Sequence, residues 1–259
     1  ATESSGYDRA TFGYNHYLLL RQYALGNFKQ LVKAITLDPA MLRYLNGYLN
    51  VATAPDENYS RELQELFTLG KENNPNYTEI DVQAAAKVLT GWQINFTNET
   101  VTFNINRHDK TNKSFSSFYG GTTISGRTDA NAGMTELDEL LNMIFNKNVE
   151  VSEFLVRKMY RWFCYYAIDS DTETNVIKPL AKILRDNNWE IKVALSALLK
   201  SEHFFDVLNY GALIKNPIDV IVGMCREFNI KFPVAGQNAQ SYAMWSILKD
   251  FSFVMQQDL

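Results

Sequence analysis

The sequence predicts a mainly α-helical globular domain over residues 1–259, with a β-hairpin and polar loop inserted at 92–133. Apolar residues recur with the 3.6-residue period of a helix on both sides of the insertion, between good helix starts and stops. Within the insertion the apolar period changes to two. No linker is polar enough to force a domain boundary, so we expect one domain with many helices.

The helices before residue 50 are predicted from their end signals. Segment 14–25 is periodic and Gly26 ends it, Asn27 caps a helix that runs to about Ile35, and Asp38 with Pro39 starts a third helix. Later, the run WQINFTNETVTFNIN alternates as a hairpin with its turn at Asn98 and Glu99. Further helices are expected at 150–167, which is apolar on most sides, and at 175–186, 190–200, 217–228 and 239–256.

The stretch 58–92 carries the densest set of charged residues beside apolar ones. Its first helix should be capped by Ser60 and end at Gly70, with Leu63, Leu66 and Phe67 on one face. Arg61 and Glu65 fall on the opposite face with the spacing of a solvated ion pair. Glu62 borders the apolar face, where a carboxylate needs a partner.

The second helix of the stretch should start at Thr78 and stop near Gly91. Thr78 and Asp81 have the spacing of a capping box, and we favour capping over catalysis for Asp81. Ala84, Ala85 and Ala86 let another helix approach closely. If that helix is the preceding one, Glu62 and Asp81 share one neighbourhood.

His108 and Asp109 follow the hairpin in a segment without apolar periodicity. Such a pair can be a metal ligand, a general base or part of a turn, and from spacing alone the turn is favoured. No zinc pattern is present. A hard divalent cation held by Glu62, Asp81 and Asp109 stays open, and no cofactor is indicated.

Composition excludes several classes of function. The net charge is −4 without a Lys/Arg-rich run, which argues against nucleic acid as a partner. Apolar runs fall far short of the ~18 residues of a membrane span. The first residues are polar, so we expect no signal peptide within this sequence. Phosphate-binding loops, dinucleotide patterns and the G-x-S-x-G elbow are also missing.

Six strings, in this order, resemble the bacterial family catalogued as domain of unknown function 1800. The resemblance covers nearly the whole sequence, and the third and fourth strings are specific. The strings are ALGNF (24–28), DPAMLRYL (38–45), ENYSRELQELFTLG (57–70), YTEIDVQAAAKVLTGW (77–92), HDK (108–110) and KNPIDVIVG (215–223).

The resemblance implies a mostly helical protein, often exported to the periplasm or the extracellular space, often encoded beside a sulfatase-like partner, and without an assigned activity. Members usually extend further at both ends. An HD pair stands at the place of His108 and Asp109, while Lys87 occupies a place where the family usually has Arg. Lys87 and Trp92, which closes the same string, are expected to belong to the binding or structural network of Arg61, Glu65 and Asp81.

Two hypotheses follow. In the first, the chain is a non-catalytic envelope or extracellular module in which Arg61, Glu62, Glu65 and Asp81 form a buried network. In the second, it is a hydrolase or lyase acting on an extracellular polymer. Glu62 and His108 would then be acid and base, Asp109 would orient the imidazole, and Arg61 would hold an anionic group.

Overall fold

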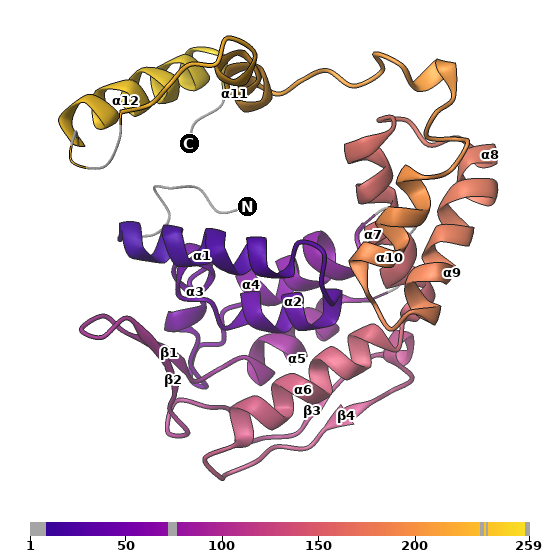
Figure 1. Cartoon of the computed structure of the whole chain (residues 1–259). Helices are drawn as coiled ribbons and strands as arrows, with labels where there is room; N and C mark the ends of the chain where they lie inside the picture. The colour runs from indigo at the N-terminus through magenta and orange to yellow at the C-terminus, as the bar shows by residue number, and fades with distance from the viewer. Residues whose placement is uncertain (1–8, 72–76, 234–235, 237, 257–259) are drawn as a thin grey trace.

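The structure is a computed structural model that describes residues 9–71, 77–233, 236 and 238–256. The fold is mainly α-helical, and the strands of the described residues form two short antiparallel pairs (Figure 1). The fold class predicted from periodicity is therefore confirmed.

The first helices are held by the predicted caps. Asn27 Oδ1 accepts from the amide of Gln30 at 3.1 Å, and Asp38 Oδ2 accepts from that of Met41 at 3.0 Å. The first helix begins four residues before the predicted start, because Phe12 already packs into the interior. The elements are α1 (Ala10–Tyr23), α2 (Phe28–Thr36), α3 (Pro39–Tyr44) and the 3-10 turn η2 (Gly47–Leu49).

The next helix departs from its predicted shape. It starts as α4 (Asn58–Glu62) and widens into a π-helix, η3 (Leu63–Thr68). Ser60 is not its cap but lies inside α4, where its hydroxyl donates to the Val82 carbonyl at 2.9 Å. The wider turn leaves Leu66 52% exposed, so its predicted place beside buried Leu63 is wrong. Gly70, at φ +79°, ends the helix as expected.

The central stretch continues into the predicted hairpin. Helix α5 (Glu79–Val88) leads to β1 (Trp92–Asn95), which pairs antiparallel with β2 (Thr100–Phe103). The polar stretch that follows is ordered rather than irregular, because β3 (Lys113–Ser114) pairs with β4 (Thr123–Ile124) around a 3-10 turn, η4 (Ser117–Tyr119).

The second half of the chain is again helical. The predicted helix 150–167 ends earlier, at Phe163, and its last turn leaves Trp162 exposed while Val151 and Val156 are buried. The elements are α6 (Ala132–Phe145), α7 (Asn148–Phe163), α8 (Ser170–Thr172), the π-helix η5 (Glu173–Ile177), α9 (Lys178–Asp186) and α10 (Ile191–Leu199).

One large apolar core joins these helices, and we call α1 to α10 with both strand pairs the body. Leu63, Val88, Leu140, Val156 and Leu184 come from five different helical segments and all belong to this core. A smaller cluster around Phe12 and Trp92 fixes the hairpin against α1 and α3.

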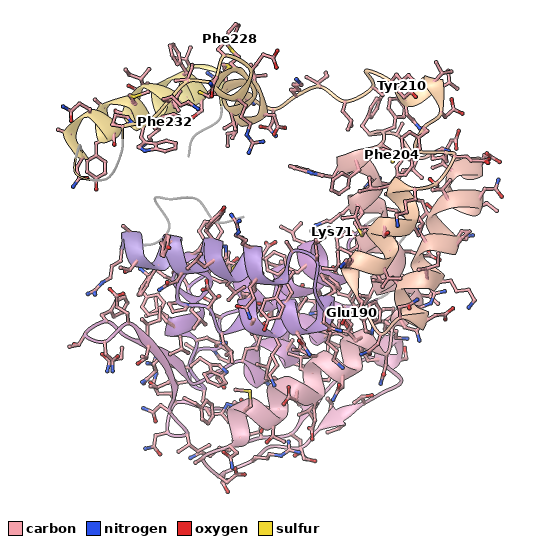
Figure 2. All side chains as sticks on the ribbon, viewed as in Figure 1. Lys71, Glu190, Phe204, Tyr210, Phe228 and Phe232 are labelled. Carbon is pink, nitrogen blue, oxygen red and sulfur yellow. The ribbon has the colours of Figure 1, made fainter. Side chains whose placement is uncertain are left out.

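The last two helices form what we call the arm, α11 (Pro217–Glu227) and α12 (Asn238–Val254). Figure 1 shows the arm standing apart from the body, joined to it by a chain segment that includes η6 (Val207–Asn209). Figure 2 places Phe204 on the body and Tyr210 on this connection. No helix within the described ranges is both long and apolar enough for a membrane span. That residues 1–259 fold as one domain stays a prediction.

Candidate functional site

A polar pocket of about 350 Å³ lies between the α4–η3 helix and the start of α5. Arg61, Glu65, Lys71, Tyr77 and Glu79 are among the residues that line it. Two of the predicted site residues, Arg61 and Glu65, therefore share one open pocket.

The charged groups of this pocket are already paired. Arg61 donates to both oxygens of Glu79, at 2.9 and 2.5 Å, and to Glu57 at 3.0 Å. The hydrogen bond from Arg61 lowers the pKa of Glu79 to about 2. The predicted Arg61–Glu65 ion pair is replaced, because Glu65 bonds to Lys71 at 2.6 Å. An anionic ligand would have to displace a carboxylate from Arg61.

Glu62 is half-buried, and its Oε2 is enclosed without a hydrogen-bond partner in the described part of the chain. A carboxylate oxygen in that position has lost its water without gaining a donor, which costs free energy. We expected Glu62 to have a partner because it borders the apolar face, and Asp81 is not that partner.

Asp81 is fully buried and satisfied. Its carboxylate completes the predicted capping box with Thr78, at 2.7 Å from the Thr78 amide. It also accepts from the amide and the hydroxyl of Ser116, each at 2.7 Å. Asp81 thus joins the start of α5 to the polar loop. Within the described chain, the four residues proposed as one network, Arg61, Glu62, Glu65 and Asp81, do not bond to one another in a single group.

A second charged cluster lies in the body, completely enclosed. The side chains of His108, Lys113 and Glu136 are each 0% exposed. Lys113 Nζ lies 2.7 Å from Glu136 Oε2 and donates to the Asp109 carbonyl at 2.5 Å. The other oxygen of Glu136 accepts from the Arg127 amide at 3.0 Å. The cluster fastens the polar loop to α6.

His108 is oriented by Thr90. Its Nδ1 lies 2.9 Å from the Thr90 carbonyl, which can only accept, so Nδ1 carries a proton. Its Nε2 lies 3.2 Å from Glu136 Oε2, within ion-pair distance but without the alignment of a hydrogen bond. Burial raises the pKa of Glu136, but His108 and Lys113 outweigh it and leave the pKa below its usual value.

Asp109 does not hold the imidazole, so its predicted orienting role passes to Thr90. The Asp109 carboxylate instead accepts from the amide and hydroxyl of Thr111, at 2.8 and 2.6 Å, and its own amide donates to Thr90 Oγ1. Burial raises the pKa of Asp109, but the Thr111 hydrogen bonds and nearby Lys113 and Lys87 more than compensate and lower it. This is the geometry of a turn.

Lys87 and Trp92 contribute to the structure around His108 and the hairpin. The Lys87 carbonyl accepts from the Thr90 hydroxyl at 2.7 Å, so the end of α5 positions the residue that orients His108. The Trp92 ring packs against Phe103 with centroids 5.2 Å apart. Its indole Nε1 is buried without a hydrogen-bond partner in the described ranges.

Glu136 is the residue that sequence reasoning missed. It lies four residues before Leu140 on the buried face of α6, so an acid within an apolar stripe was a readable signal. Nothing in the local sequence says that its partner is Lys113. That pairing joins residues 23 apart through the fold.

No metal centre is assembled from the predicted ligands. Among the residues that the structure describes, no group of three or more His, Cys, Asp or Glu side chains could hold a metal ion. Asp81 already accepts a hydrogen bond from Ser116 and Asp109 one from Thr111, so with Glu62 they do not form the cation site considered from the sequence. The acid and base roles of Glu62 and His108 stay predictions.

Comparison with known proteins gives a match to a protein family. A family model described as "Protein of unknown function (DUF1800)" matches residues 1–256. No curated protein matches, and no solved structure matches.

Proposed function

Since this chain belongs to that family, whose description assigns no activity, we propose that it is a non-catalytic helical module of the bacterial envelope or the extracellular space. It would work by presenting surfaces to a partner rather than by chemistry. We include in the proposal a sulfatase-like protein as the partner that the family resemblance suggests.

The observation that carries the proposal is the closure of the charged cluster at His108. A group that meets a substrate must come within hydrogen-bond reach of it, whereas the His108 imidazole has no exposed surface. Glu136, Lys113 and Asp109 hold each other and the loop backbone. The arrangement supports a structural use of these charges.

A hydrolase or lyase remains the second candidate, and the polar pocket at Arg61 favours it. There a guanidinium, the Lys71 ammonium and the Tyr77 phenol line one opening of about 350 Å³. This candidate needs His108 to become accessible. Activity on an anionic extracellular polysaccharide that is lost in both Glu62→Gln and His108→Asn would replace our proposal with it.

The test of the structural use is a double-mutant cycle at the enclosed pair. Lys113→Met leaves the Glu136 carboxylate short of its closest cation, so it should destabilise the chain by about 3–5 kcal/mol, a fall in Tm on the order of 10 °C. Adding Glu136→Leu removes the stranded charge, so the double variant should recover much of that loss. Thermal unfolding followed by circular dichroism measures both.

Lys110→Met is the matched control, because Lys110 is an exposed lysine three residues away. Its Tm should match that of the unchanged chain. A Lys113→Met variant as stable as this control would show that the cluster does not hold the fold, and the structural use would then be abandoned.

A further inference from the structure

The two helices of the arm enclose an apolar groove. Two adjoining pockets, of about 520 and 380 Å³, lie along the seam of α11 and α12 and share Val222, Trp245 and Leu248. Because the pockets have three lining residues in common, we treat them as one groove. Pockets of about 300–1,000 Å³ with mainly apolar walls are typical of small-molecule sites.

The groove is built from both helices and the loop between them. Ile221 is its most buried apolar wall residue, and Trp245 stacks on Phe232 with ring centroids 4.5 Å apart and planes 14° apart. Figure 2 shows Phe232 beneath α12. The stacked pair gives the groove a wide apolar wall.

All the charged residues that line the groove are cationic. Lys249 lines the larger pocket and Arg226 the smaller. The acidic residues of the arm, Asp219, Glu227 and Asp250, line neither pocket. No described residue forms an ion pair with Lys249 or Arg226. An apolar groove whose wall carries two cations without an ion-pair partner among the described residues is complementary to a molecule with an apolar chain and an anionic head.

We propose that the α11–α12 groove binds a free long-chain fatty acid, with its acyl chain in the seam and its carboxylate on Lys249 or Arg226. The exposed acids of the arm disfavour an anionic bilayer surface as the occupant. A second protein helix would need acidic groups placed against both cations. A fatty acid fits both features of the groove, because its single acyl chain suits the apolar seam and its carboxylate suits a cation of the wall.

This inference does not rest on the proposed function. The groove belongs to the arm, whereas the enclosed charges belong to the body, and Figure 1 shows the two parts separated. Loss of either proposal leaves the other unchanged.

The experiment is a fluorescence titration of the whole chain with cis-parinaric acid, followed by displacement with palmitate. Saturable binding and full displacement are expected. Shortening the competitor by two methylenes should weaken its affinity for the groove roughly 10-fold, because each buried methylene adds about the same amount to the binding free energy. Hexadecanol, which has the same chain length and no charge, should compete at least 10-fold less well.

Variants test the cations and the apolar part of the groove separately. Lys249→Met combined with Arg226→Met removes both cations and should weaken parinaric acid roughly 10-fold or more. Val222→Trp fills the part that both pockets share and should weaken the fatty acid and the alcohol together. Lys231→Met is the matched control, because this exposed lysine between α11 and α12 lines neither pocket, and the affinity of this variant for parinaric acid should not change.

Three results would overturn the proposal. The first is no saturable binding, or binding equal in the double-cation variant and in Lys231→Met. The second is sedimentation with phosphatidylglycerol vesicles that palmitate does not reverse, which would identify a bilayer as the occupant. The third is a dimer in light scattering that Val222→Trp dissociates, which would identify a second copy. Helical content by circular dichroism confirms that each variant is folded.

Discussion

At the scale of single residues, Glu62 and Asp81 show how one local pattern leads to opposite outcomes. Both carboxylates border an apolar helix face. Asp81 receives hydrogen bonds from Thr78 and Ser116, whereas the enclosed oxygen of Glu62 receives none from the described residues. The helix wheel shows which carboxylates need a hydrogen-bond donor, but for Asp81 a donor comes from a residue 35 positions away.

The unsatisfied oxygen reverses the stability effect expected of Glu62. Had Glu62 belonged to a satisfied network, Glu62→Gln would lower Tm. Because no described residue donates to its buried Oε2, replacing the charge by a neutral amide should stabilise the chain by about 1 kcal/mol, a rise in Tm of roughly 2–4 °C. Differential scanning calorimetry measures the shift.

Asp81→Asn is the opposing control for this change. It weakens a satisfied carboxylate that caps α5 and holds Ser116, so its Tm should fall by several degrees. A clear fall in Tm for Glu62→Gln as well would show that Glu62 has a partner that stabilises the fold.

At the scale of elements, Glu136 attaches α6 to the polar loop and makes that attachment sensitive to acid. Its pKa is lower in the folded chain than its ordinary value of 4.5. The folded state therefore binds the proton less readily than the unfolded state. The Glu136 carboxylate therefore makes its full contribution to the stability of the fold above about pH 4.5. That contribution is lost as the pH falls through the lower pKa of the folded state.

Urea unfolding across this acid range should therefore distinguish the chain from Glu136→Gln. The unchanged chain should lose up to about 1.4 kcal/mol per pH unit from this one carboxylate, and the variant should lack that component. Other carboxylates contribute equally to both proteins, so the difference between the two curves isolates Glu136. Parallel curves would mean that Glu136 has the same pKa folded and unfolded.

Elements with local end signals were predictable, and elements shaped by distant contacts were not. Asn27, Asp38 and the Thr78–Asp81 box mark helix starts through bonds within three residues, and the hairpin follows from strict alternation. The π-turn of η3 has no such signal. Neither does the order of the polar loop, which depends on long-range hydrogen bonds to Asp81 and Glu136.

At the scale of the whole molecule, helical periodicity predicted α11 and α12 but not what they pack against. The arm's principal packing is between its own two helices, and the segment leading to it is largely exposed. Ile214 on this segment is 97% exposed. A connection with so little packing should open to a protease before the body does.

We therefore expect trypsin under native conditions to cut first after Lys215, which is exposed on this connection. The cut should separate the arm from a body that keeps its own core, so the Tm of the body should change by less than about 2 °C. Mass spectrometry of the first fragments and calorimetry of the cut chain provide the two measurements.

Lys215→Gln should delay that first cut without altering the Tm, since Lys215 forms no ion pair with a described residue. Should the body unfold at a clearly lower temperature once the arm is released, the arm must stabilise it by contacts across the gap of Figure 1. The single domain predicted over residues 1–259 would then describe the molecule better than a body with a separate arm.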